Sequence, residues 1–167
     1  PRIGTYTLVE SSARETNWVH TSSSQMECTL DEYDTMTVDW GNVSIGAGGA
    51  NASSFWASRE GQALTTFDDL AFMSSLYLRN AKGADFNPAT TKALSNWLMR
   101  ATTANMAYML SVQLAAMELN VRHSYVSGSA LVYAPGLSLY GTIGLNSAGF
   151  ISINDLMAAA AAEIQAH

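Results

Sequence analysis

The spacing of apolar residues changes once along this 167-residue chain, near residue 46. Before that point, apolar and polar residues alternate with a period of two, which is typical of strands with two unlike faces. After it, apolar residues recur every three or four positions, as on amphipathic helices. Because the two patterns occupy successive segments, the sequence predicts an α+β fold with separate sheet and helical parts.

Three strands are predicted in the first part, residues 1–45. They cover residues 4–10, 24–30 and 35–40. Residues 31–34, Asp-Glu-Tyr-Asp, favour a turn, so the second and third strands are predicted to form a hairpin. On the third strand, one face carries Met36, Val38 and Trp40.

The only cysteine, Cys28, lies on the second predicted strand. A single cysteine excludes an intrachain disulfide and the paired cysteines of redox and zinc motifs. Free cysteine usually behaves as a small buried hydrophobe. We therefore expect the Cys28 side chain to be buried against the sheet.

A segment rich in glycine, alanine and serine, residues 46–54, separates the two parts. Its glycines match neither the spacing of a dinucleotide-binding loop nor that of a P-loop, and no Lys-Ser/Thr pair follows them. The segment is therefore predicted to be a joint between two units. Phe55 and Trp56 follow it directly and are expected to anchor the start of the helical part.

About four helices are predicted in residues 55–167, which would pack as a small bundle. Their N-terminal signals are Thr66, Asn87 with Pro88, Thr102 or Thr103, and Ser152 with Asp155. The third helix, residues 104–121, is apolar on most sides. Its narrow polar edge consists of Gln113, Glu118 and Asn120. A helix of this kind is expected at the centre of a bundle, with its methionines filling the core.

The chain carries a formal net charge of −6 and is 13% charged, compared with about 25% in an average soluble domain. Negative charge opposes the attraction that supplies most non-specific affinity for nucleic acid, and it opposes adhesion to anionic lipid. The uncharged stretch at residues 101–117, most of which lies in the third predicted helix, is too short and too polar to span a bilayer. We therefore expect neither a nucleic-acid partner nor a membrane span. The high apolar content instead favours surface that neighbouring subunits bury.

The sequence contains no evident cofactor or catalytic motif. His20, His123 and His167 lack a second ligand at metal-binding spacing, and the serine-hydrolase and zinc-protease motifs are missing. A hydrolase that uses Asp or Glu stays an open alternative, which would require two carboxylates about 5 to 9.5 Å apart in a cleft. Our prediction is a protein without a cofactor or enzymatic activity.

Two groups of polar residues are weak candidates for a ligand or a modification. The calcium candidates are Asp31, Glu32, Asp34 and Asp39. They lack the spacing of a calcium-binding loop, which favours a solvated acidic turn. Asn42 and Asn51 each begin an N-x-S/T sequon, and they are candidate glycosylation sites if the chain enters a glycosylating compartment.

The stretches GTYTLVESS and TMTVDWGNV, at residues 4–12 and 35–43, resemble the end of a collagen-adhesin B-type or SdrD B-like domain. Such domains are prealbumin-like β-sandwich repeats of bacterial surface proteins. The later stretches NMAYMLSVQLAAMELNV and ALVYAPG resemble the helical C-terminal region that follows these repeats in large secreted proteins. The resemblance implies an extracellular, cell-surface protein with a partial antiparallel β-sandwich followed by helices.

In the isopeptide-forming members of this family, a glutamate promotes bond formation between a lysine and an asparagine. Glu10 matches the position of the glutamate, and Asn42 resembles the asparagine. The matching lysine does not exist here, because Lys82 and Lys92 are the only lysines and both lie in the helical part. The resemblance therefore implies the SdrD B-like type, which has no isopeptide bond.

A sandwich of this family has about seven strands, and residues 1–45 supply three or four. The uncovered edges and faces would be completed by upstream sequence or by another copy of the chain. We therefore predict a non-enzymatic structural subunit of a surface filament, fibre or adhesin that assembles with copies of itself. Its predicted assembly surface consists of Tyr6, Leu8, Met36, Val38 and Trp40.

A carbohydrate- or matrix-binding module is the alternative function. The predicted ligand contacts are Tyr125, Tyr133 and Tyr140, which lie around a short predicted strand at residues 131–133 and a glycine-punctuated loop after it. Tyrosine combines an apolar ring with a polar hydroxyl, so these side chains suit a sugar or a protein partner. Core packing explains the same tyrosines equally well.

Overall fold

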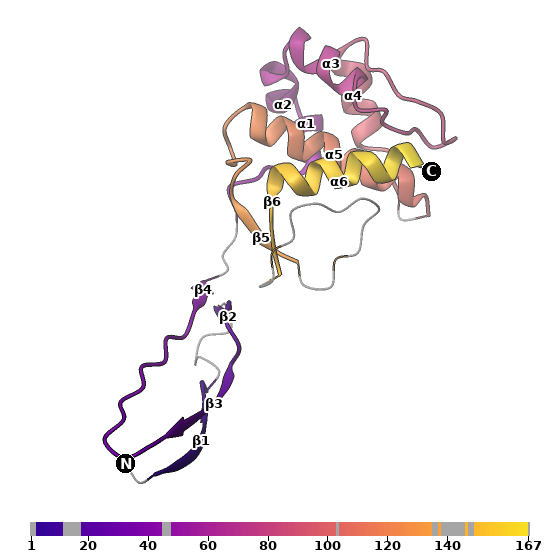
Figure 1. Ribbon diagram of the computed structural model, residues 1–167. Helices are drawn as coiled ribbons and strands as arrows, with labels where there is room; N and C mark the ends of the chain where they lie inside the picture. Colours follow the sequence, from indigo (N-terminus) through magenta and orange to yellow (C-terminus); the bar gives the residue numbers. More distant parts are fainter. Residues whose placement is uncertain are drawn as a thin grey trace. The chain divides into compact units, whose positions relative to one another are not determined.

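The computed structural model describes residues 3–11, 18–44, 48–102, 104–134, 137, 146 and 149–166. The chain divides into two compact units, Pro1–Ala47 and Gly48–His167, which we call the β unit and the helical unit (Figure 1). The described residues form six helices and three short antiparallel sheets, so the predicted α+β class is confirmed. None of the helices in these ranges is long and apolar enough to cross a bilayer.

The β unit contains two antiparallel pairs of strands. They are β1 (Gly4–Val9) with β3 (Gln25–Leu30), and β2 (Trp18–His20) with β4 (Asn42–Ser44). In the first pair, Tyr6 lies opposite Cys28 and Leu8 lies opposite Met26, so these four side chains share one face. The other face is mostly polar, and two threonine hydroxyls hydrogen-bond across it.

The prediction of a third strand at residues 35–40 is wrong. Those residues form no strand, and β3 pairs with β1 instead. The chain does turn at residues 31–34, where the N–H of Asp34 donates to the carbonyl of Asp31 at 3.2 Å and Tyr33 has a φ of 71°. Alternating side chains indicate that a segment can be extended, but they do not determine which neighbour it pairs with. The first two predicted strands are confirmed as β1 and β3.

The helical unit consists of six helices and one strand pair (Figure 1). The helices are α1 (Ser53–Ala57), α2 (Arg59–Leu64), α3 (Phe67–Ser74), α4 (Thr91–Leu98), α5 (Met106–Arg122) and α6 (Ile153–Ala166). The strands are β5 (Leu131–Tyr133) and β6 (Phe150–Ser152), which pair antiparallel. The predicted strand at residues 131–133 is therefore confirmed, whereas its partner β6 was not predicted. Figure 1 shows α6 lying alongside α5.

The long helix α5 is central to the core of this unit, as its nearly all-round apolar pattern predicted. Its most buried apolar side chains are Tyr108, Val112, Leu114, Ala115, Ala116 and Leu119. Trp56 of α1 and the Leu94, Trp97 and Leu98 stripe of α4 join the same core. Trp56 has no exposed surface, which confirms its predicted role as the anchor of the helical part.

The predicted helix starts are correct at two helices and wrong at two others. Thr66 caps α3, and Ser152 accepts a hydrogen bond from the Asp155 N–H at the start of α6. Helix α4 begins after Thr90 rather than at Pro88, and α5 is capped by Asn105 rather than by a threonine. The segments before α4 and α5 contain several residues that suit a cap, and the choice between neighbours depends on tertiary packing.

Candidate functional site

The β1–β3 face is the apolar side of the first strand pair, formed by Tyr6, Leu8, Met26, Cys28 and Leu30. Cys28 is buried, as predicted, with 6% of its surface exposed. Leu8 and Met26 are each 38% exposed, although they lie directly opposite one another. The face therefore exposes an apolar cross-strand pair beside a buried thiol.

The β unit has almost no hydrophobic core of its own. Cys28 is the only hydrophobic side chain that is buried among its described residues. Seven large hydrophobic residues of the same unit are exposed: Ile3, Leu8, Val9, Trp18, Met26, Tyr33 and Met36. Two-stranded sheets are at best marginally stable in water, and sheets usually need a third strand or a packed face. The described residues of this unit therefore leave a large part of its apolar surface uncovered.

Both edges of the β1–β3 pair are unpaired within the described part of the chain. The N–H of Glu10 donates to the carbonyl of Ser24 at 2.9 Å, which makes these two residues a hydrogen-bonded pair. Because hydrogen-bonded and non-hydrogen-bonded pairs alternate in antiparallel sheets, the pair Thr7 and Glu27 directs its backbone groups outward. Each edge thus offers donors and acceptors to a further strand.

The fold brings together only some of the residues of the predicted assembly surface. Tyr6 and Leu8 lie together on the β1–β3 face. Met36, Val38 and Trp40 were predicted to share a strand face, and this is wrong because residues 35–40 form no strand. Met36 is nevertheless 49% exposed, so it adds to the uncovered apolar surface of the unit.

A small polar cluster links the two strand pairs of the β unit. Glu10 directly follows β1, His20 ends β2 and Asn42 begins β4. Glu10 Oε2 lies 3.0 Å from His20 Nδ1, and Asn42 Nδ2 donates to Glu10 Oε1 at 2.5 Å. The family resemblance singled out Glu10 and Asn42, and the fold brings them together without a lysine. The contact between His20 and Glu10 was not predicted from the sequence, because no motif relates these two residues along the chain.

The acidic residues proposed as calcium ligands do not form a site. Asp31, Glu32, Asp34 and Asp39 are all exposed. Within the described ranges, no three His, Cys, Asp or Glu side chains come close enough to hold a metal ion. The Asp34 carboxylate instead accepts a hydrogen bond from the Asp31 N–H at 3.3 Å, which stabilises the turn.

The two glycosylation candidates differ in their accessibility. Asn42 is exposed, and its side-chain nitrogen donates to Glu10. The side-chain nitrogen of Asn51 is buried in the helical unit without a hydrogen-bond partner. A glycan attached to that nitrogen would have to displace packed atoms, so the folded unit disfavours modification at Asn51.

Two of the tyrosines proposed as ligand contacts, Tyr125 and Tyr133, contact core residues. The Tyr125 ring lies 5.9 Å from Trp56 and 6.1 Å from Phe55, although Tyr125 itself is 40% exposed, and the Tyr133 ring lies 5.0 Å from Phe150. No ring contact joins Tyr125 to Tyr133 in the described part of the chain, and Tyr140 lies outside the described residues. Tyr125 and Tyr133 therefore do not form one aromatic platform.

A buried carboxylate, Asp69, fastens the start of α3 to the end of α5. Its Oδ1 accepts a hydrogen bond from Arg122 Nε at 2.7 Å, and its Oδ2 lies 3.1 Å from His123 Nε2. Thr66 donates to the same carboxylate from both its N–H and its hydroxyl, at 2.8 and 2.7 Å. Burial alone raises the pKa of Asp69, but the hydrogen bonds from Arg122, Thr66 and His123 outweigh it and hold that pKa at about 2.

We expect the helical unit to lose stability in acid because of Asp69. Its folded pKa lies below the ordinary value of 3.8, so its stabilisation is complete above about pH 4 and disappears as pH falls towards 2. The shift corresponds to about 2 kcal/mol. Urea unfolding at pH 7 should show that loss for Asp69→Asn and little change for exposed Asp68→Asn. Equal effects of the two substitutions would contradict this assignment.

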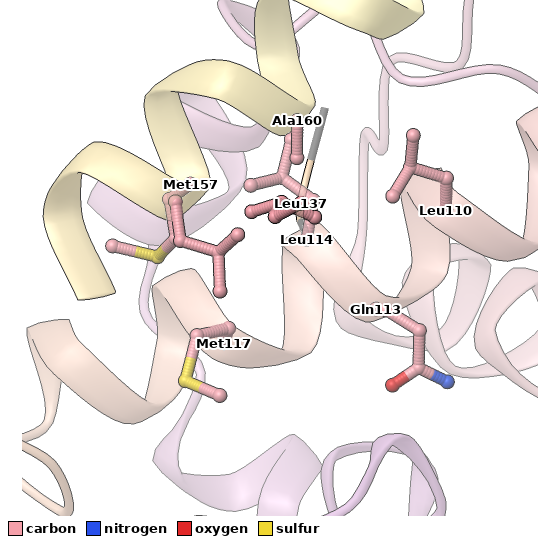
Figure 2. Close-up of a pocket in the computed structure, with 8 residues that line it drawn as sticks. Leu110, Gln113, Leu114, Met117, Leu137, Met157 and Ala160 are labelled. Carbon is pink, nitrogen blue, oxygen red and sulfur yellow. The ribbon is translucent and has the colours of Figure 1, made fainter. Parts of the chain in front are cut away.

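An apolar pocket of about 310 Å³ lies between α5 and α6 (Figure 2). Leu110, Leu114 and Met117 line it from α5, and Met157 and Ala160 line it from α6. Among the described residues that line it, Gln113 is the single polar side chain, and none is charged or nucleophilic. These residues suit an apolar group.

Comparisons with known proteins add no assignment. No protein-family model, curated protein or solved structure matches the chain. The proposed function therefore rests on the residues of the β unit described above.

Proposed function

We propose that this chain is a non-enzymatic structural subunit that assembles with copies of itself through its β unit. The observation that carries the proposal is the missing core: one buried hydrophobic side chain and seven exposed ones among the described residues of that unit. Burying apolar surface contributes roughly 25 cal/mol per Å², so covering the β1–β3 face would stabilise both the unit and the assembly. Strand addition would at the same time pair the open backbone edges.

The proposed assembly completes a partial antiparallel β-sandwich of the collagen-adhesin B-type or SdrD B-like kind. The resemblance at residues 4–12 and 35–43 supports this fold for the β unit, and it supports an extracellular location at a bacterial surface. The contact between Glu10 and Asn42 is consistent with the same resemblance. A heterologous contact, in which the β unit of one copy is covered by another copy, extends into a filament unless its rotation closes a ring.

The assembly is expected to disappear when the β1–β3 face becomes charged. Leu8→Lys combined with Met26→Glu places opposite charges directly across the strands, so the pair itself stays compatible with the sheet. Sedimentation velocity and electron microscopy of the wild-type chain should show assemblies that grow with concentration. The double variant should sediment as a monomer.

A matched control lies on the opposite face of the same strand. Thr7→Lys adds one charge opposite Glu27, away from the β1–β3 face, and should leave assembly unchanged.

Glu27→Pro removes an outward-facing N–H and should block strand addition at the β3 edge without breaking the β1–β3 ladder. A wild-type chain that stays monomeric at every concentration would overturn the proposed function.

The alternative function, carbohydrate or matrix binding, is not favoured by the tyrosines first considered for it. Tyr125 and Tyr133 contact core residues instead of one another. We therefore consider saccharide binding at a different cleft of the helical unit, where it can be tested independently of assembly.

A further inference from the structure

A cleft of about 410 Å³ opens in the helical unit between the loop after α3 and the C-terminal part of α4. Its volume falls within the 300–1,000 Å³ typical of small-molecule sites. The described residues of the lining combine aromatic rings with two cations, Lys82 and Arg100, and include no carboxylate. Such a lining is unusual in a chain whose net charge is −6.

The two cations of the cleft are not neutralised by the protein. Among the described residues, neither Lys82 nor Arg100 forms an ion pair. By contrast, Arg79 pairs with Asp85 and Arg122 pairs with Asp69. Both cleft cations are exposed, so they keep their charge available for a ligand.

The loop that carries Lys82 is held in place by its own hydrogen bonds. The side-chain oxygen of Asn80 accepts from the N–H of Lys82 at 2.8 Å and from the N–H of Ala84 at 3.3 Å. Asn105 fastens the loop to the start of α5 by donating to the carbonyl of Ala81 at 3.1 Å. The backbone at Lys82 is thus held in place before a ligand arrives, which lowers the entropic cost of ordering the loop on binding.

The aromatic wall of the cleft can contact a ligand from one side only. The rings of Phe86 and Trp97 are stacked on each other, with centroids 4.5 Å apart and planes 4° apart. Tyr108 packs beside Trp97 and donates its hydroxyl to the Trp97 carbonyl at 2.5 Å. Trp97 and Tyr108 are buried, with 5% and 3% of their surfaces exposed, so the partly buried Phe86 supplies the aromatic surface that a ligand can reach. The Phe86 ring suits the apolar C–H face of a sugar ring.

We propose that this cleft binds an acidic saccharide, with its carboxylate held by Arg100 and Lys82 and one ring face against Phe86. Arginine binds carboxylates with paired hydrogen bonds, which favours a uronic acid over a neutral sugar. Asn96 is exposed on the α4 side of the cleft and offers an amide to sugar hydroxyls. The site lies wholly in the helical unit, so saccharide binding and assembly through the β unit can be tested independently.

The test is a titration of the full chain with digalacturonic acid, using isothermal calorimetry for affinity and the Trp97 indole N–H resonance for location. Arg100→Gln and Lys82→Gln should each weaken binding about tenfold, since each removes a charge-assisted contact. Arg59→Gln is the matched control, because Arg59 is exposed on α2 and does not line the cleft. It should leave affinity within about twofold.

Neutral digalactose and inorganic phosphate complete the comparison. Digalactose should bind at least about tenfold more weakly than the diacid, since it cannot pair with either cation. Phosphate should not reach the affinity of the diacid, because it has no ring to place against the aromatic wall. Undetectable diacid binding, equal binding of the neutral sugar or phosphate, or unchanged affinity in Arg100→Gln would each overturn the proposal.

Discussion

Replacing Asn120 by leucine is expected to destabilise the helical unit by about 3 kcal/mol, although leucine is close to asparagine in size. Asn120 is 1% exposed and lies on the central helix α5. Its side-chain oxygen accepts from the Asn51 N–H, and its nitrogen donates to the Asn51 carbonyl, both at 2.8 Å. A third hydrogen bond of 2.8 Å reaches the carbonyl of Ala116. Leucine would leave both backbone groups of Asn51 without these partners.

Urea unfolding followed by far-ultraviolet circular dichroism measures this loss, because the helices dominate that signal. Gln113→Leu is the matched control, since Gln113 is an exposed amide on the same helix. It should change the free energy of unfolding by no more than about 0.5 kcal/mol. If Asn120→Leu were as mild as the control, the clamp between Asn51 and α5 would not contribute to stability.

The burial of Asn120 and its hydrogen-bond partner could not be predicted from the sequence. On the third predicted helix it belongs to a narrow polar edge, and the structure buries it. Its real partner, the backbone of Asn51, lies 69 residues earlier in the chain. Helical periodicity assigns a residue to a side of its helix, but it cannot show that another segment covers that side with matching backbone groups.

Local signals predicted the elements that depend on local chemistry. Thr66 correctly marked the start of α3, and alternation correctly marked β1 and β3. Pairing between strands is a long-range property, which is why the hairpin predicted with residues 35–40 failed. The short helices α1 and α2 were missed for a related reason, since each is too short for periodicity to detect.

Candidate sites within one strand were predicted from the sequence, whereas sites formed by separate segments were not. Tyr6 and Leu8 were found because a period of two places them on one strand face. The bridge from His20 to Glu10 and the cleft between Lys82 and Arg100 bring together separate segments, which a single sequence does not relate to each other. Burial differs between the two units: the described residues of the helical unit bury a large hydrophobic cluster, whereas those of the β unit bury one hydrophobic side chain, Cys28.

Gly61→Ala is expected to cost the helical unit about 3 kcal/mol, against the local preference of a helix for alanine. Gly61 lies on α2, where alanine would normally stabilise a helix by about 1 kcal/mol. An added methyl carbon would lie 2.5 Å from the Cα of Trp56 and closer still to the carbonyl oxygen of Phe55. These are backbone atoms of α1, so no side-chain rotation can relieve the overlap, and α1 would have to move with the fully buried Trp56.

Gly83→Ala provides the comparison, because it makes the same substitution where space is open. No atom lies within 4 Å of the added methyl group, but Gly83 has a φ of 78°. Its cost should therefore be the conformational strain alone, about 1 kcal/mol. Urea unfolding of both variants at pH 7 should rank Gly61→Ala as clearly the less stable. A stabilised Gly61→Ala would show that α1 and α2 do not pack as closely as this corner requires, because helix propensity would then outweigh the steric term.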